Sequence, residues 1–203
     1  MNNLTKTASI LDKFCHILSI AIKIAAVCLI VGLGIIAAGF LFDLPPQMVG
    51  SGYASVKIGF ITFTVAENYL PDYHTIWAQV AAGMLLALLC LIPTHLIVKS
   101  IRAILDPMKA GEPFHNDVSI HLGKIARYVF VLGIGLNLSV IISSILLTKA
   151  FDLHLLLLSE HISRVEFMFT FDFSFLLVSG ILLLLSYVFR YGEQLQLLSD
   201  ETL

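Results

Sequence analysis

The chain has 203 residues, of which 58% are hydrophobic and 13% are charged, and its mean hydropathy is +0.94. About a quarter of the residues in a soluble globular domain carry charge, so this composition excludes that class and indicates a membrane protein. The formal net charge of −2 offers no basic field for nucleic acid. We therefore expect one membrane domain, residues 1–203, that makes no direct contact with nucleic acid and whose surroundings are the lipid bilayer.

Four apolar runs are long enough to cross the hydrocarbon layer of a bilayer, which takes about 20 residues of helix. They occupy residues 24–42, 74–98, 128–147 and 173–189. The predicted fold class is therefore an all-α membrane protein, a bundle of four transmembrane helices.

The first run has an alternative interpretation as a signal peptide, because Ala37, Ala38 and Gly39 are small residues that follow an apolar stretch. The apolar core of a signal peptide is usually about 7 to 15 residues long, which is shorter than this run. We expect the segment to be retained as a span.

Orientation follows from lysine and arginine, because these side chains resist translocation. With both termini in the cytoplasm, eight basic residues lie inside and three lie outside. The inner ones are Lys6, Lys13, Lys99, Arg102, Lys109, Lys124, Arg127 and Arg190, and the outer ones are Lys57, Lys149 and Arg164. Lys23 begins the first span, where its stem can carry the ammonium back to the inner interface, and a functional intramembrane role is the alternative. We predict that both termini are cytoplasmic.

The two outer connections, residues 43–73 and 148–172, alternate apolar with polar residues. This two-residue period is typical of strands. In the first connection, apolar residues alternate from Val56 to Phe60 and again from Ile61 to Val65, and the pattern changes beside Gly59. We predict a small antiparallel β cap on the extracytoplasmic side, in which strands of the first loop pair with residues 164–171. The cap ties the loops together or, as the alternative, senses a ligand or peptide.

Small residues at four-residue spacing indicate where helices approach each other in lipid. Gly34 and Ala38 form one such pair, and Gly135 and Ser139 begin another series. Asn137 carries an amide side chain inside the third span, so we expect this side chain to bond to a neighbouring helix, with a substrate contact as the alternative.

The cytoplasmic connection, residues 99–127, predicts a helical hairpin below the membrane. The second helix can continue inward until Pro107 and Gly111 end it, and a new helix starting at Asp117 leads into the third span. The cytoplasmic tail, residues 190–203, extends the fourth helix.

Two motifs resemble the signature stretches of a bacterial four-span family, the YoaS-like domain-of-unknown-function family. They are the turn Gly111-Glu112-Pro113-Phe114 followed by Asn116, and residues 189–196 followed by Ser199-Asp200-Glu201-Thr202. The resemblance covers essentially the whole chain. It implies a multi-pass protein of the bacterial cell (inner) membrane with no established activity. Genes of this family often neighbour one for a small helix-turn-helix regulator, so the resemblance also implies a cytoplasmic DNA-binding partner.

Two functional hypotheses follow. In the first, the chain is a non-enzymatic regulatory or sensory membrane component that presents a cytoplasmic surface to the helix-turn-helix regulator. That surface consists of Arg102, Lys109, Glu112, Phe114, His115, Glu193 and Asp200. Topology alone also explains the basic members, which is the alternative for them. In the second hypothesis the chain is a small transporter, export or immunity factor. Its polar path would be lined by Asn137, Ser139, Ser143 and Ser186.

The sequence contains no motif for catalysis, a cofactor or a metal. Cys15, Cys28 and Cys90 have no metal-ligand spacing, and His154, Glu160 and His161 lack the spacing of a zinc hydrolase. We predict that the protein is not an enzyme, with an intramembrane or metal-dependent enzyme as the remaining alternative. The small-residue faces can pack helices within one chain or join two copies, so a homo-oligomer is an alternative to a monomer.

Overall fold

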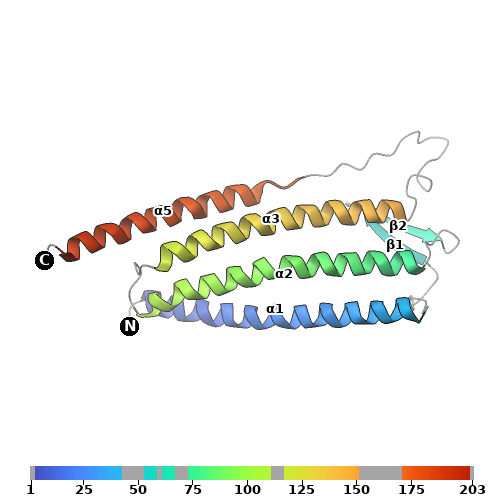
Figure 1. Ribbon diagram of the computed structural model, residues 1–203, viewed down its shortest axis with the longest axis horizontal. Coiled ribbons are helices and arrows are strands. Elements are labelled where there is room, and N and C mark those ends of the chain that lie inside the picture. Colours follow the sequence, from blue (N-terminus) through green and yellow to red (C-terminus); the bar gives the residue numbers. More distant parts are fainter. Residues whose placement is uncertain are drawn as a thin grey trace. The chain divides into compact units, whose positions relative to one another are not determined.

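Four long helices make up most of the computed structural model (Figure 1). They are α1, Asn3–Leu41; α2, Tyr73–Ala110; α3, Asp117–Ala150; and α5, Ser174–Glu201. The structure describes residues 3–42, 53–58, 61–66, 73–110, 117–150 and 171–201. At about 1.5 Å per residue, these helices are about 42 to 58 Å long, so each exceeds the hydrocarbon thickness of about 30 Å.

All four helices are long and apolar enough to cross a membrane. They contain the four apolar runs found in the sequence, except that Phe42 and Phe173 lie just outside the helix ends. The prediction of four apolar helices is therefore confirmed. The chain belongs to the class of multi-pass helical membrane proteins.

The second helix extends well beyond its apolar run. It continues through Pro93 and Pro107 and ends at Ala110. A proline has no N–H group to donate to the carbonyl four residues earlier, so each one interrupts the hydrogen-bond ladder of the helix. Beside Pro93, the Thr94 hydroxyl donates to the Cys90 carbonyl over 2.8 Å, which adds a bond at this point.

The chain divides into two compact units. Unit 1 consists of Met1–Cys28, Ala87–Asn137 and Phe171–Leu203, and unit 2 consists of Leu29–Leu86 and Leu138–Thr170. Unit 1 therefore contains part of each of the four helices, and unit 2 contains part of α1, α2 and α3.

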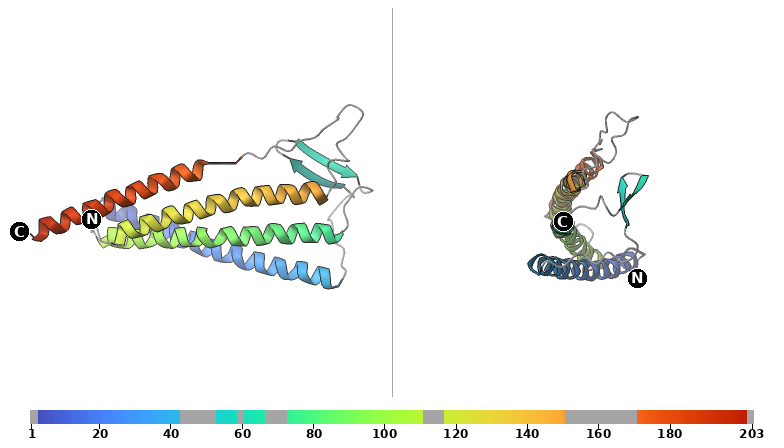
Figure 2. Two further views of the ribbon diagram at one scale, coloured as in Figure 1. Left: turned by 45° about the horizontal axis from the view of Figure 1, so that its top comes forward. Right: turned by 90° about the vertical axis from the view of Figure 1, so that its right-hand side faces the viewer.

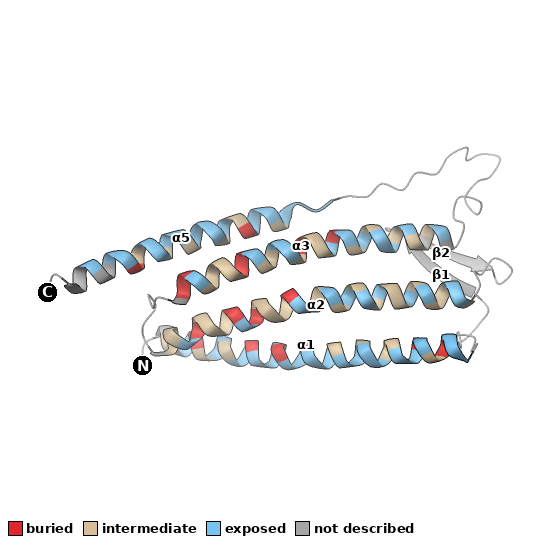
Figure 3. Cartoon of the chain, viewed as in Figure 1, coloured by how far each residue is buried: buried red, intermediate tan, exposed pale blue. Residues whose placement is uncertain are grey.

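Unit 1 holds the main buried apolar cluster. Its α1 members, Ala8, Cys15 and Ile22, pack with Val98 and Leu105 of α2. The three α1 residues recur every seven positions, which keeps them on one side of the helix. Figure 3 shows buried positions along all four helices. The apolar stripe explains why α1 remains helical for about 20 residues before its predicted span begins.

Close packing in unit 2 depends on glycines other than those that the spacing indicated. A Cβ at Gly32 would lie 3.0 Å from Cε of Met84, and one at Gly39 would lie 3.1 Å from the Trp77 ring. Nothing lies within 4 Å of a Cβ built on Gly34, which we had expected at a helix contact. The prediction identified a small-residue helix face but placed the contact on the wrong glycine, because the register between helices is not visible in one helix alone.

Unit 2 also contains two paired strands, β1, Tyr53–Ile58, and β2, Ile61–Ala66 (Figure 2). They are antiparallel, with Val56 opposite Phe63 and Ile58 opposite Ile61. The change of pattern beside Gly59 thus falls between two strands that pair with each other. The predicted partner strand, residues 164–171, lies outside the described residues except for Phe171, which is not in a strand.

Candidate functional site

An ion cluster joins the polar ends of α1 and α2 in unit 1. Asp12 Oδ1 lies 3.1 Å from Nε of Arg102, and its Oδ2 lies 2.6 Å from Nζ of Lys109. The Lys109 ammonium also contacts Asp106 at 3.0 Å. Hydrogen bonds from Lys109 and then Arg102 hold the pKa of the Asp12 carboxyl below its usual value. The cluster fixes the two helices to each other some 12 residues before the first predicted span.

The sequence pattern predicts a partner surface at Arg102 and Lys109 and gives no role to Asp12. In the structure both basic side chains bind Asp12 instead of standing apart from the fold. A signal was available, because Asp12 is the single acidic residue among the first 42. An isolated carboxylate among basic residues is a natural ion-pair partner for a neighbouring helix.

Glu193 of α5 is buried and binds the first turn of α3. Its Oε1 accepts a hydrogen bond from the Ser119 backbone N–H at 3.3 Å, and its Oε2 accepts one from the Ser119 hydroxyl at 2.9 Å. Ser119 is the third residue of α3, so its N–H has no partner within that helix. Glu193 therefore caps α3 from another helix and places negative charge at its positive end.

A third bond extends this contact. The Ser186 hydroxyl, two turns earlier on α5, donates to the Ser119 carbonyl over 2.7 Å. The N–H, the hydroxyl and the carbonyl of Ser119 thus all bind α5. Glu193, like Arg102 and Lys109, is a predicted member of the partner surface. Its carboxylate instead binds another helix of the same chain.

The other four members of the predicted partner surface are outside the side chains that the structure describes. Glu112, Phe114 and His115 lie outside the described residues. Asp200 belongs to α5, but its side chain is likewise outside the described set. The three members that the structure does place fall into two groups, one around Asp12 and one at Ser119.

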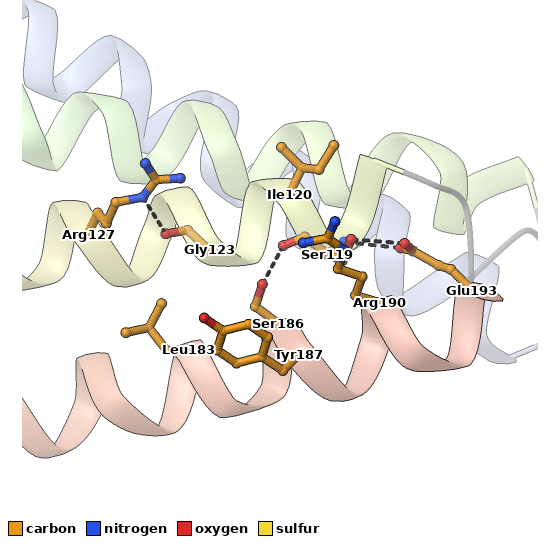
Figure 4. Close-up of a pocket in the computed structure, with 9 residues that line it drawn as sticks. All are labelled: Ser119, Ile120, Gly123, Arg127, Leu183, Ser186, Tyr187, Arg190 and Glu193. Atoms are coloured by element: carbon orange, nitrogen blue, oxygen red, sulfur yellow. Dashed lines mark hydrogen bonds between the residues drawn. The ribbon is translucent and has the colours of Figure 1, made fainter. Parts of the chain in front are cut away.

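A pocket of about 520 Å³ opens between α3 and α5, next to the Ser119 contacts (Figure 4). Arg127 and Ser119 line it from α3, and Arg190, Tyr187 and Glu193 line it from α5. The Arg127 Nε donates to the Gly123 carbonyl at 3.3 Å. Two guanidinium groups and one carboxylate give the lining a net positive charge, which suits an anionic ligand.

The amide of Asn137 joins α3 to the start of α5. Its Nδ2 donates to the Gly133 carbonyl at 2.8 Å and to the Asp172 carbonyl at 3.1 Å, and its Oδ1 accepts from the Asp172 N–H at 2.9 Å. The amide finds its partner in the backbone two residues before α5, where we had expected a partner in a helix.

Asp172 in turn caps α5. Its Oδ1 accepts from the Ser174 N–H at 2.8 Å and from the Ser174 hydroxyl at 2.5 Å, and these bonds hold the pKa of the Asp172 carboxyl below its usual value. Because Asn137 lies 13 residues before the end of α3 at Ala150, α5 begins beside the middle of α3. Neither span length nor composition indicated this offset.

The described residues contain no group of three or more His, Cys, Asp or Glu side chains that could hold a metal ion. Cys15, Cys28 and Cys90 are free thiols. His154, Glu160 and His161 fall in a segment that the structure does not describe.

No family model matches the chain, and no curated protein or solved structure is detectably similar to it.

Proposed function

We propose that the chain is a non-enzymatic regulatory component of the bacterial inner membrane, with both termini in the cytoplasm and a helix-turn-helix regulator as its cytoplasmic partner. The observation that carries this proposal is the gathering of basic residues in one unit. Unit 1 contains nine of the chain's 12 lysines and arginines, namely the eight assigned to the cytoplasm and Lys23. Positive residues are retained on the cytoplasmic side, so unit 1 is the cytoplasm-facing part of the protein.

The polar contacts of unit 1 support a role in binding a partner. Asp12 fixes α1 to α2, and Glu193 fixes α5 to α3, so four helix ends are held by charged side chains. Such contacts give the segment between α2 and α3, with Glu112, Phe114 and His115, two firmly held flanks. Asp200 lies in α5 itself, seven residues after Glu193.

Sidedness is tested by cysteine labelling in intact cells. The three native cysteines are replaced by serine, and single cysteines are introduced as Lys57→Cys on β1 and Lys99→Cys on α2. A membrane-impermeant maleimide should label Lys57→Cys in intact cells and Lys99→Cys only after permeabilisation. The reverse pattern would overturn the proposed orientation.

The partner role is tested by co-purification in detergent with the proposed helix-turn-helix regulator, which we expect a neighbouring gene to encode. The triple variant Glu112→Ala, Phe114→Ala, His115→Ala should lose capture, because it removes a carboxylate, an aromatic ring and an imidazole from the proposed surface. Lys57→Ala is the matched control on the opposite side and should retain capture. Equal capture by both variants would contradict the proposed surface.

The β1–β2 pair belongs to the extracytoplasmic cap in this proposal, with residues 164–171 as a third strand. A two-stranded hairpin is marginal in water on its own, which supports the addition of another strand. Lys57, one of the three basic residues assigned to the outside, lies in β1. Protection of β2 amides in hydrogen exchange should fall when Phe167→Asp and Phe169→Asp disrupt the alternating segment.

The transport hypothesis has less support from the contacts. Of its four path residues, Asn137 bonds to backbone at Gly133 and Asp172, and Ser186 bonds to the Ser119 carbonyl. These bonds are those of packing residues that join helices. A polar path would require both side chains to turn away from satisfied partners.

A further inference from the structure

The pocket between α3 and α5 contains more positive charge than its own contacts use. Arg190 makes no hydrogen bond or ion pair within the described part of the chain. In the same described residues, Arg127 bonds through its Nε alone, which leaves both terminal nitrogens of its guanidinium available. Glu193, the only carboxylate among the lining residues, already accepts two hydrogen bonds from Ser119. Two guanidinium groups therefore line the pocket with N–H groups that are available to a ligand.

Both arginines stand at the ends of apolar segments. Arg127 immediately precedes the third apolar run, residues 128–147, and Arg190 immediately follows the fourth, residues 173–189. Such positions place a guanidinium at the membrane surface, where the phosphate groups of lipids lie. Ile120 and Leu183 line the same pocket, so it also offers apolar contact.

We infer that this pocket binds the phosphate group of an anionic phospholipid from the cytoplasmic leaflet. The planar guanidinium of arginine presents paired donors that match two phosphate oxygens, and Arg127 and Arg190 offer them from two helices. Basic pockets between membrane helices on the cytoplasmic side are suited to lipid headgroups. The choice of leaflet rests on the proposed orientation of the chain, whereas the binding chemistry does not.

The size of the pocket favours a lipid headgroup over a free phosphate ion. Its lining extends along α3 from Ser119 to Arg127, which is about 12 Å at 1.5 Å per residue. A phosphate ion fills only part of a volume of about 520 Å³. A glycerol phosphate headgroup extends further, with its hydroxyls near Tyr187 and its acyl chains near Leu183.

Glu193 explains how a carboxylate can line an anion site. Its two oxygens are occupied by the N–H and hydroxyl groups of Ser119 at the positive end of α3. The negative charge is thus directed at the helix terminus. Among the described residues neither arginine has a comparable partner, so the arginines dominate the remaining field of the pocket.

The test measures thermal stabilisation of the purified full chain in neutral detergent. Phosphatidylglycerol, phosphatidylcholine and inorganic phosphate are added separately over the same concentration range. The variants are Arg127→Gln, Arg190→Gln and the double variant. Lys99→Gln is the matched control, because it removes an exposed positive charge at the end of an apolar run without touching the pocket.

Phosphatidylglycerol should raise the melting temperature of the wild type more than the other two additions do. Each arginine variant should weaken the apparent Kd by about tenfold, as expected for the loss of a charge-assisted hydrogen bond. Lys99→Gln should weaken it by less than about twofold, the range of an exposed charge. If the double variant does not fold, Arg127→Lys with Arg190→Lys keeps the charge and should still weaken binding, because lysine lacks the paired donors.

Three results would overturn the inference. They are an equal shift with phosphatidylcholine, an equal loss in Lys99→Gln, and an inorganic phosphate shift as large as that of phosphatidylglycerol. Because detergent has no sidedness, failure here leaves the proposed orientation intact. Reversed cysteine labelling, conversely, would change the leaflet and not the binding chemistry.

Discussion

The carboxylate of Glu193 on α5 accepts hydrogen bonds from both the backbone N–H and the hydroxyl of Ser119, the third residue of α3. A contact between residues 74 positions apart thus caps α3 from another helix. It couples the tail, which continues past Glu193, to the start of the helix that follows the cytoplasmic connection.

Replacement of Glu193 should therefore destabilise the fold. We expect Glu193→Ala to lower the free energy of unfolding by about 1 to 3 kcal/mol, because the Ser119 donors lose their acceptor in a buried position. Glu193→Gln should cost less, since it keeps one acceptor and loses only the charge at the helix end. Thermal unfolding in detergent measures both, with exposed Gln194→Ala as the control. Equal melting temperatures for Glu193→Ala and Gln194→Ala would contradict the capping role.

Asp12 should confer a dependence of stability on pH. Its pKa is lowered in the folded state below the usual 3.8, so its contribution is full above that value and is lost as pH falls through the folded pKa. The ion pairs are partly exposed, and we expect Asp12→Asn to cost about 0.2 to 1 kcal/mol at neutral pH. Melting temperatures of the wild type and Asp12→Asn should converge in acid. A constant difference across this range would show that the charge of Asp12 is not the cause.

The apolar runs could be read from sequence because lipid imposes a simple length requirement on any helix that crosses it. The alternation around Gly59 was equally local, and its two halves are the strands β1 and β2. Both features depend on neighbouring residues, so no knowledge of tertiary register was required.

The contacts of the candidate site depend on register between helices and could not be predicted in the same way. Asp12 and Arg102 are 90 positions apart, and Asn137 and Asp172 are 35 positions apart. A charge near a helix end has the same pattern whether it binds a partner protein or the next helix. Because of this ambiguity, the sequence predicts a partner surface at Arg102, Lys109 and Glu193. In the structure each of these side chains contacts another helix of the same chain.

Asn137 sets the level at which α5 begins. Asn137→Ala would leave the Asp172 N–H and carbonyl without their side-chain partner, at a cost of about 0.6 to 2 kcal/mol for a hydrogen-bonding side chain in a membrane helix. Hydrogen exchange at Asp172 should accelerate in this variant, while exchange in the middle of α5 stays slow. Exposed Leu138→Ala is the control. Unchanged exchange at Asp172 would show that another contact holds the start of α5.

Gly133 allows α3 and α5 to approach each other. A Cβ at this position would overlap Cβ and Cγ of Phe175, whose ring also packs edge-on against Phe130 with centroids 5.8 Å apart. We expect Gly133→Ala to destabilise the protein by about 1 to 3 kcal/mol, the cost of overpacking a formed contact. Phe175→Gly removes both of these atoms, so Gly133→Ala should be nearly neutral in the Phe175→Gly background.

Gly34→Ala is the matched control for this steric argument. It places the same methyl group in a helix, but nothing lies within 4 Å of the new Cβ. Alanine also has the higher helix propensity, so Gly34→Ala should leave the melting temperature unchanged or raise it slightly. Thermal unfolding of both glycine variants and of the Phe175 double variant separates steric overlap from loss of helix flexibility. Equal destabilisation at Gly133 and Gly34, or no rescue by Phe175→Gly, would refute a close α3–α5 contact at this glycine.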